Sequence, residues 1–295
     1  MASAPIWMRE RFLEQLKANE LQALPYLFDF WALDHQLPPE GDWRTWVILG
    51  GRGAGKTRAG AEWVRAQVEG SRSLQAGVAR RVALVGETYD QVRDVMIEGE
   101  SGILRCTPPD RRPQWKATSR KLVWPNGAEA QAFSAHDFEA LRGPQFDAAW
   151  VDELAKWKSA EDAWDMLQFC LRLGNNPQAV VTTTPKNVPV LKDILARKST
   201  VMTHGATEVN RANLARGFLT EVMERYGGTR MGRQELDGLL LEDIEGSFWS
   251  TPLLDALRVD EVPAFDRIVI GVDPAVSSGG TADETGIVVV GAVTS

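Results

Sequence analysis

The sequence predicts an α/β fold with a mostly parallel central sheet, and three observations support this prediction. Short apolar runs alternate with segments of helical periodicity along most of the 295 residues. A glycine-rich loop, Gly50–Thr57, joins one apolar run to a helical segment. An acidic pair, Asp152 and Glu153, directly follows another apolar run. Alternation of strands and helices favours parallel pairing of the strands.

The elements are expected in the following order. Residues 6–33 have the apolar spacing of one or two amphipathic helices, at 6–16 and 21–33, with Pro25 as a start or a kink. A turn-rich stretch, 36–42, precedes the first strand. Strands are predicted at 43–49, 82–85, 148–151 and 179–183, a helix at 58–68, and a hairpin at 122–128 that turns at Asn126–Gly127.

The charge of the chain is unevenly distributed. There are 33 Lys and Arg against 40 Asp and Glu, a net charge of −7, but residues 230–295 contain 12 of the acids and 4 of the bases. The remainder is near neutral, so binding of DNA through a local basic patch stays open. The hypothesis for such a patch is a cluster around Trp115, with a solvated loop as the alternative: Arg105, Arg111, Arg112, Lys116, Arg120 and Lys121.

Several classes of protein are excluded by composition. No apolar run approaches the ~20 residues of a membrane span, and the N-terminus lacks the apolar core of a signal peptide. Two Cys and three scattered His support neither a disulfide framework nor a structural zinc site. The expected location is therefore a reducing cytoplasm, away from membranes.

The strongest motif is the sequence G-x-x-x-x-G-K-[ST], located between a predicted strand and a predicted helix. Glycines allow backbone N–H groups to close around phosphate, and the helix N-terminus adds positive potential. Lys56 is expected at the β and γ phosphates and Thr57 at Mg²⁺, so ATP and Mg²⁺ are the predicted cofactors. The candidate binding residues are Gly50, Gly51, Arg52, Gly53, Ala54, Gly55, Lys56 and Thr57.

The acidic pair supplies the second half of a nucleotide-hydrolysing site. Asp152 is expected to hold Mg²⁺ through water, and Glu153 to polarise the attacking water. The 95 residues from Thr57 to Asp152 leave room for an extra strand. This combination predicts a P-loop NTPase of the additional-strand, catalytic-glutamate type, and favours an ATP-driven motor over a small-molecule kinase.

Further candidates surround these motifs. Thr182, Thr183 and Thr184 end the next strand, where a hydroxyl could sense the γ-phosphate and transmit its loss; a simple turn is the alternative. Gln36 has an amide suited to an adenine edge.

Two arginines are candidates for stabilising the transition state of phosphoryl transfer. Arg52 could act within its own subunit, and Arg142 on the nucleotide of a neighbour. A structural salt bridge is the alternative for each.

The end of the chain has a different composition. We expect an ATPase domain at 1–245, a linker at 246–265 and the start of a second domain at 266–295. Strands at 267–273 and 286–293 predict a β-hairpin, with Asp273 placed as a metal ligand of a two-metal nuclease. About 30 residues cannot bury an independent core, so the chain is expected to stop inside that domain.

The ordered set of motifs resembles the large terminase subunit of tailed bacteriophages and of phage-like gene transfer agents. The resemblance implies a motor ATPase that pumps double-stranded DNA into a procapsid, followed by an RNase H-like nuclease that uses Mg²⁺ or Mn²⁺. It also implies a small terminase subunit and the portal as partners, a homo-oligomeric ring with the monomer as the alternative state in solution, and Arg142 as a finger across that ring. The motifs that carry it are 36–39, 50–57, 87–89, 141–143, 151–153, 182–185 and 271–274.

Two other functions are alternatives to the packaging motor. A helicase-like DNA translocase would share the loop and the acidic pair, but it would need motor motifs in a second RecA-like lobe, which the sequence does not contain. A non-catalytic assembly protein would have a dead site, whereas Lys56, Thr57, Asp152 and Glu153 are all present.

Overall fold

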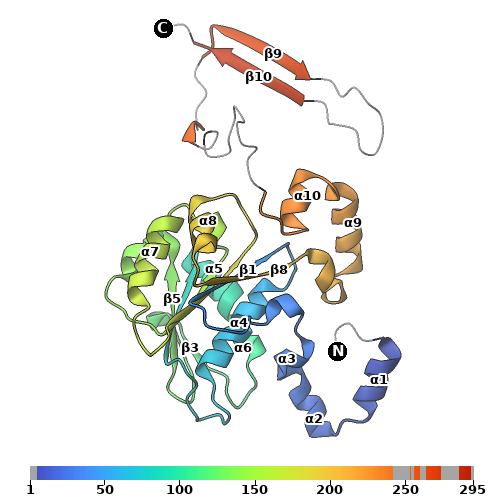
Figure 1. The fold of residues 1–295 in the computed structure, drawn as a ribbon, viewed down its shortest axis with the longest axis vertical. Helices are drawn as coiled ribbons and strands as arrows, with labels where there is room; N and C mark the ends of the chain where they lie inside the picture. Colours follow the sequence, from blue (N-terminus) through green and yellow to red (C-terminus); the bar gives the residue numbers. More distant parts are fainter. Residues whose placement is uncertain (1–4, 242–252, 254–255, 260–263, 274–285, 294–295) are drawn as a thin grey trace. The chain divides into compact units, whose positions relative to one another are not determined.

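The computed structural model describes residues 5–241, 253, 256–259, 264–273 and 286–293. The chain divides into two compact units, Met1–Ile244 and Glu245–Ser295 (Figure 1). Most of the predicted linker, 246–265, lies outside the described residues.

The first unit is built on an eight-stranded sheet with the strand order β3-β4-β5-β2-β6-β7-β1-β8. All neighbouring strands from β5 to β8 are parallel, and β3 and β4 are antiparallel additions at one edge. The mostly parallel α/β fold is therefore confirmed, as is the turn at Asn126–Gly127. The strands are β1 Thr45–Gly50, β2 Arg81–Gly86, β3 Gln114–Lys116, β4 Lys121–Val123, β5 Glu129–Ser134, β6 Ala148–Asp152, β7 Gln178–Thr183 and β8 Thr200–Gly205.

The position of β7 decides which residues meet at the edge of the sheet. β7 pairs with β6 on one side and with β1 on the other, so it separates the strand of the glycine loop from the strand of the acidic pair. The sequence spacing left room for an extra strand before Asp152. Strands β2 to β5 lie in that stretch of the chain. The strand that lies between the two motifs in the sheet, β7, comes after Asp152 in the sequence.

Helices cover both faces of this sheet, and each face has its own apolar core. Figure 1 shows α4 (Lys56–Val68) and α6 (Ile103–Cys106) on one side, and α7 (Ala160–Cys170) and α8 (Pro189–Ala196) on the other. Because side chains alternate along a strand, Trp46 and Trp150 face α4, while Val47 and Val151 face α7 and α8. All four are fully buried. This packing holds the ends of β1, β6 and β7 in fixed relation.

The N-terminal helical segment differs from its prediction. The helix expected at 21–33 is wrong in extent, because the chain forms α2 (Ala18–Ala23), a 3-10 turn η1 (Leu24–Tyr26) and α3 (Phe28–Trp31) after α1 (Ile6–Glu14). Pro25 lies in the first turn of η1. Proline lacks the backbone N–H that a continuing α-helix requires, so the helix is interrupted there. The turn η2 (Asp34–Gln36) then leads toward β1.

Strands β3 and β8 were not predicted. β8 is an edge strand in which exposed and half-buried residues alternate, and it includes polar Thr203 and His204. It therefore has no apolar run that periodicity could detect. The remaining elements are α5 Tyr89–Gln91, η3 Val92–Ile97, η4 Ala117–Ser119, η5 Ala135–Leu141, η6 Leu154–Lys156, η7 Thr207–Asn213, α9 Arg216–Tyr226 and α10 Arg230–Glu235.

In the second unit, β9 (Arg267–Asp273) and β10 (Gly286–Ala292) pair antiparallel, as the hairpin prediction requires. Apolar side chains on both faces of this ribbon are exposed, among them Ile270 and Val289 at 62% and 63%. Among the residues described in both units, no helix is long and apolar enough to cross a membrane.

Candidate nucleotide-binding site

The glycine loop runs from the end of β1 to the start of α4, and its shape requires glycine. Gly53 and Gly55 have φ of +74° and +84°, a region that residues with a Cβ rarely adopt. At Gly51, a Cβ would lie 2.2 Å from the carbonyl oxygen of Leu236. The loop therefore adopts a tight turn against the rest of the unit.

Every carbonyl of this loop from Gly50 to Gly55 accepts a hydrogen bond from a side chain. The donors are Lys56 Nζ to Gly50 and Gly51 (2.9 Å each), Thr207 Oγ1 to Arg52 (2.7 Å), Asn210 Nδ2 to Gly53 (2.6 Å), His35 Nε2 to Ala54 (2.9 Å) and Gln36 Nε2 to Gly55 (3.1 Å). Within the described part of the chain, the amides of Gly53, Gly55, Lys56 and Thr57 donate to no protein atom. These donors are available to an anion at the start of α4.

Lys56 is buried over the loop that it follows. Besides the two carbonyls, its ammonium group donates to Thr184 Oγ1 at 3.2 Å. Burial lowers the pKa of Lys56, and the nearby carboxylates of Glu153 and Asp152 oppose that shift. Thr57 lines the same groove as Glu153. Lysine, threonine and acids from three distant segments are thus brought to one place.

Asp152 ends β6 in a half-buried position. Its Oδ1 accepts a hydrogen bond of 2.6 Å from Thr182 Oγ1. Burial, reinforced by the charge of Glu153, raises the pKa of Asp152 to about 7, although the bond from Thr182 works against it. A divalent cation beside this group would favour the charged form.

Glu153 adopts a left-handed backbone conformation, with φ of 57°. Its amide donates to the carbonyl of Thr182 at 2.6 Å. Its Oε2 accepts from the amide of Thr184 at 3.3 Å and lies 3.1 Å from Nζ of Lys156. Such strained conformations in non-glycine residues cluster at functional sites.

The three threonines at the end of β7 have different partners. Thr182 contacts Asp152, and Thr184 contacts both Lys56 and Glu153. Thr183 Oγ1 accepts from the amide of Ala155, which lies in η6 just after the acidic pair. This strand end therefore connects the glycine loop to both acids.

Both candidate arginines form ion pairs near the surface. Arg52 Nε lies 2.7 Å from Oε2 of Glu235, and Arg142 Nε lies 2.8 Å from Oε2 of Glu139; each arginine side chain is 66% exposed. Arg52 lines the groove with Lys56 and Glu153, whereas Arg142 does not. In this structure both arginines therefore form salt bridges, the alternative to a catalytic role that the sequence left open.

The groove over the glycine loop continues into a second, more aromatic groove. Phe28, Trp31 and Gln36 line this second part, and Asn210 and Asn213 line both. The amide of Gln36 is already engaged, because its Oε1 accepts from the amide of Leu33 at 2.9 Å and its Nε2 donates to Gly55. Pairing of Gln36 with adenine would therefore use its second proton and second lone pair.

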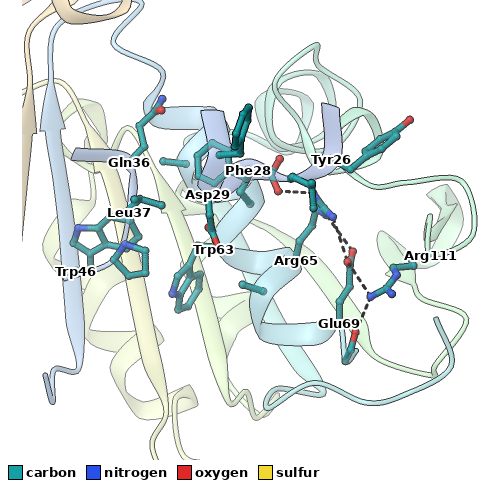
Figure 2. A pocket seen from close by; sticks show the side chains of 17 residues that line it. Tyr26, Phe28, Asp29, Gln36, Leu37, Trp46, Trp63, Arg65, Glu69 and Arg111 are labelled. Atoms are coloured by element: carbon teal, nitrogen blue, oxygen red, sulfur yellow. Dashed lines mark hydrogen bonds and ion pairs between the residues drawn. The ribbon is translucent and has the colours of Figure 1, made fainter. Parts of the chain in front are cut away.

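A further cavity of roughly 600 Å³ shares Phe28 and Gln36 with the aromatic groove (Figure 2). It separates the segment around Phe28 from the outer face of α4. Figure 2 shows ion pairs along its wall, where Glu69 lies 3.2 Å from Arg65 and 4.0 Å from Arg111. The Glu69–Arg111 pair connects the C-terminal end of α4 to the loop before β3, at the end of the helix opposite the glycine loop.

The predicted basic patch is largely occupied by internal contacts. Arg111 donates to the carbonyls of Gly70 and Ser71, and Arg112 to that of Thr107. Lys121 pairs with Glu129 at 2.8 Å, and the guanidinium of Arg120 stacks 3.6 Å from the centre of the Tyr89 ring. Four of the six cations thus have partners within the chain, which weakens the hypothesis that this patch binds DNA.

Asp273 ends β9 and is exposed, opposite Gly286 in the ladder. The described residues contain no group of three or more His, Cys, Asp and Glu side chains that could hold a metal ion. The nuclease function expected from the sequence therefore stays a prediction.

Sequence reasoning missed four residues of the site: His35, Thr207, Asn210 and Glu235. Their partners in the loop are 19 to 183 positions away in the chain. Only His35 had an available signal, because it precedes Gln36 in a segment already singled out.

The sheet order, the loop and the acidic pair define a P-loop NTPase of the additional-strand type. The family described as "Terminase large subunit, T4likevirus-type, N-terminal" matches residues 47–255. Since this match covers more than half of the chain, the protein belongs to the large terminase family, whose members form packaging motors. No curated protein matches the chain.

Solved structures agree with this assignment at the level of fold. The large terminase ATPase domain of Thermus phage P74-26 is 17% identical, with a TM-score of 0.51 over 68% of this chain and 90% of that one. The large terminase of a thermophilic bacteriophage, in complex with ADP, is 16% identical, with a TM-score of 0.55 over 92% and 64%. That of bacteriophage HK97 is 16% identical, with a TM-score of 0.51 over 88% and 57%. This chain thus spans less than two thirds of the latter two proteins.

Proposed function

We propose that this protein is the ATP-hydrolysing subunit of a motor that translocates double-stranded DNA into a viral procapsid. The observation that carries the proposal is the meeting of the open glycine loop, Lys56, Asp152 and Glu153 at one edge of a parallel sheet. Ligands of α/β proteins bind at the carboxyl ends of such strands. Membership of the large terminase family links this site to packaging.

The triphosphate would occupy the groove above the loop, where the amides of Gly53, Gly55, Lys56 and Thr57 can donate to it. Lys56 would exchange the carbonyls of Gly50 and Gly51 for the β and γ phosphates, and its ammonium group is already within the loop. The base would enter the aromatic groove beside Phe28 and Trp31. A groove with charged and polar residues beside the loop, continuous with an aromatic one, supports the proposal that the pair takes a triphosphate and a base.

The donor set fits Mg²⁺, which prefers hydroxyl, carboxylate and water oxygens. Thr57 would bind it directly and Asp152 through water. The bound ion would neutralise charge on the β and γ oxygens. Glu153 would orient the attacking water, and its contact with Thr184 would report loss of the γ-phosphate to β7.

The arginines would complete the site after leaving their present partners. Arg52 lies beside its own groove and would act in cis once it separates from Glu235. Arg142 is outside its own groove and would act on a neighbour in a homo-oligomeric ring. The other proposed partners are the small terminase subunit and the portal, in the cytoplasm of a bacterial host. A nuclease that uses Asp273 with Mg²⁺ or Mn²⁺ is proposed for the complete second domain.

The test is ATP turnover by the purified chain, with and without linear double-stranded DNA, beside a Glu153→Gln variant. Turnover that DNA increases and that the variant lacks would support the motor. Nucleotide binding without turnover, in the chain alone and with procapsids present, would contradict hydrolysis. Absence of nucleotide binding would refute the site itself.

A further inference from the structure

The segment η7, which follows β8, holds the middle of the glycine loop from outside. Thr207 Oγ1 donates to the carbonyl of Arg52 at 2.7 Å, and Asn210 Nδ2 to that of Gly53 at 2.6 Å. Both side chains belong to buried residues, with exposures of 1% and 8%. Arg52 and Gly53 lie between the end of β1 and the start of α4, where neither a strand ladder nor a helix constrains the backbone.

Each of the two donors is itself held in place. The amide of Thr207 donates to the carbonyl of Leu236 at 2.7 Å. Oδ1 of Asn210 accepts from Nδ2 of Asn213 at 2.8 Å, which orients the Asn210 amide with its nitrogen toward Gly53. The carbonyls of Arg52 and Gly53 are thus anchored to side chains that are themselves hydrogen-bonded within the protein, independently of the nucleotide.

We infer that Thr207 and Asn210 are positioning residues that keep the phosphate loop open before nucleotide binds. A peptide unit whose carbonyl is held outward directs its N–H to the opposite side. Opposite the Arg52 carbonyl held by Thr207 is the amide of Gly53, which donates to no described protein atom and is available to the groove. Opposite the Gly53 carbonyl held by Asn210 is the amide of Ala54, which donates to the carbonyl of Gly51 at 3.2 Å and closes the turn. A loop with this many glycines has a large conformational entropy when free, and ordering it on binding would weaken affinity. Because the fold already fixes the conformation of the loop, the ligand binds to a preorganised set of donors.

The inference rests on the proposed function, and its probe is inorganic tripolyphosphate with Mg²⁺, which can occupy the phosphate nest without a base. Thr207→Val and Asn210→Leu each remove one donor with little change in side-chain volume. Since a single hydrogen bond contributes about 1 kcal/mol, we expect the dissociation constant measured by titration calorimetry to rise roughly five- to tenfold in each variant. The kcat for ATP should stay within about twofold while KM rises.

Two controls separate this role from a general structural one. Thr207→Ser retains the hydroxyl and should restore tripolyphosphate affinity. Trp31→Ala, in the aromatic groove, should weaken ATP binding and leave tripolyphosphate binding unchanged. Thermal unfolding of each nucleotide-free variant verifies that the fold is intact.

The outcomes are distinguishable. Affinity for tripolyphosphate equal to that of the unmodified protein in both Thr207→Val and Asn210→Leu would overturn the inference and leave the motor proposal intact. An equal loss in Thr207→Ser and Thr207→Val would also overturn it, because the hydroxyl would then be irrelevant. Failure of the unmodified protein to bind either ligand would instead overturn the proposed function.

Discussion

The hydroxyl of Thr182 joins buried Trp150 to half-buried Asp152 in β6: it accepts a hydrogen bond of 2.8 Å from Nε1 of Trp150 and donates one of 2.6 Å to Oδ1 of Asp152. Trp150 donates to this hydroxyl, which leaves the single proton of Thr182 for an acceptor. The carboxylate of Asp152 at 2.6 Å is closer and more strongly charged than the carbonyl of Val151 at 3.2 Å, so the proton favours Asp152. The end of β7 therefore favours the charged state of the residue proposed to hold Mg²⁺.

Replacing Thr182 by valine should weaken the response to magnesium. Without the hydroxyl, the pKa of Asp152 rises further, and a larger fraction of the protein must lose a proton before the metal can bind. We expect the Mg²⁺ concentration for half-maximal ATP turnover at pH 7 to rise several-fold, and to recover at pH 8.5. Thr182→Ser is the matched control, and a pH-independent defect in the valine variant would argue against this account.

The pKa of Asp152 also predicts how the metal-free protein responds to pH. Its folded pKa of about 7 exceeds the usual value of 3.8, so the native state binds more protons than the unfolded state between these values. The free energy of unfolding should therefore fall as pH rises from 4 to 7. The total decrease is at most about 1.4 kcal/mol for each unit by which folding raises the pKa of Asp152. Denaturant titrations in EDTA would measure this slope. Asp152→Asn should remove that contribution, and an unchanged slope would contradict it.

The left-handed backbone at Glu153 predicts opposite consequences of two inactivating substitutions. Glycine adopts φ of 57° without steric conflict, whereas alanine keeps the strain. Both variants lack the carboxylate and should lose ATP turnover. Chemical denaturation should nevertheless find Glu153→Gly more stable than Glu153→Ala by about 1 kcal/mol. Equal stabilities would show that the conformation is not strained.

The different positions of the two arginines predict different behaviour in mixed assemblies. An Arg142→Ala subunit retains an intact groove and could receive Arg142 from a Lys56→Ala neighbour. Mixing these two inactive variants should restore part of the ATP turnover in the presence of procapsids and DNA. Arg52→Ala mixed with Lys56→Ala should remain inactive, because Arg52 lines its own groove. Recovery in the second mixture and not the first would reverse the two assignments.

Two helical glycines offer a matched test of packing. A Cβ at Gly60 of α4 would lie 2.3 Å from the indole of Trp150, whereas one at Gly217 of α9 would meet nothing within 4 Å. Gly60→Ala should lower the free energy of unfolding by roughly 1–3 kcal/mol through overpacking. Gly217→Ala should raise it by up to about 1 kcal/mol through helix propensity. Thermal unfolding of both variants would show whether α4 depends on this close approach to β6.

The parts of the site that were predictable are those encoded by local spacing. The loop at 50–57 and the acids at 152–153 each combine a run of apolar residues with a short motif, and parallel pairing then brings them to one edge of the sheet. Neither β7 as the separating strand nor the partners of Arg52 and Gln36 could be obtained this way. Those depend on which of several acids and carbonyls the folded chain brings within hydrogen-bonding distance.

The same reasoning explains the less accurate elements. β8 exposes one side, so its polar residues conceal its strand character, and Pro25 indicates a possible break without the geometry needed to locate it. The hydrogen bonds from Thr207 and Asn210 to the loop could not be predicted from the sequence, because threonine and asparagine are common in turn-rich segments.

The ribbon of β9 and β10 has a practical consequence for handling the purified protein. Ile268, Ile270, Val288 and Val290 are all at least 58% exposed, and the outer edges of the two strands are long, apolar and free of proline. Such edges are templates for intermolecular strand addition. Colloidal behaviour of this chain should therefore be governed by a short terminal segment remote in sequence from the nucleotide groove, with turbidity rising steeply with concentration in buffers that promote apolar association.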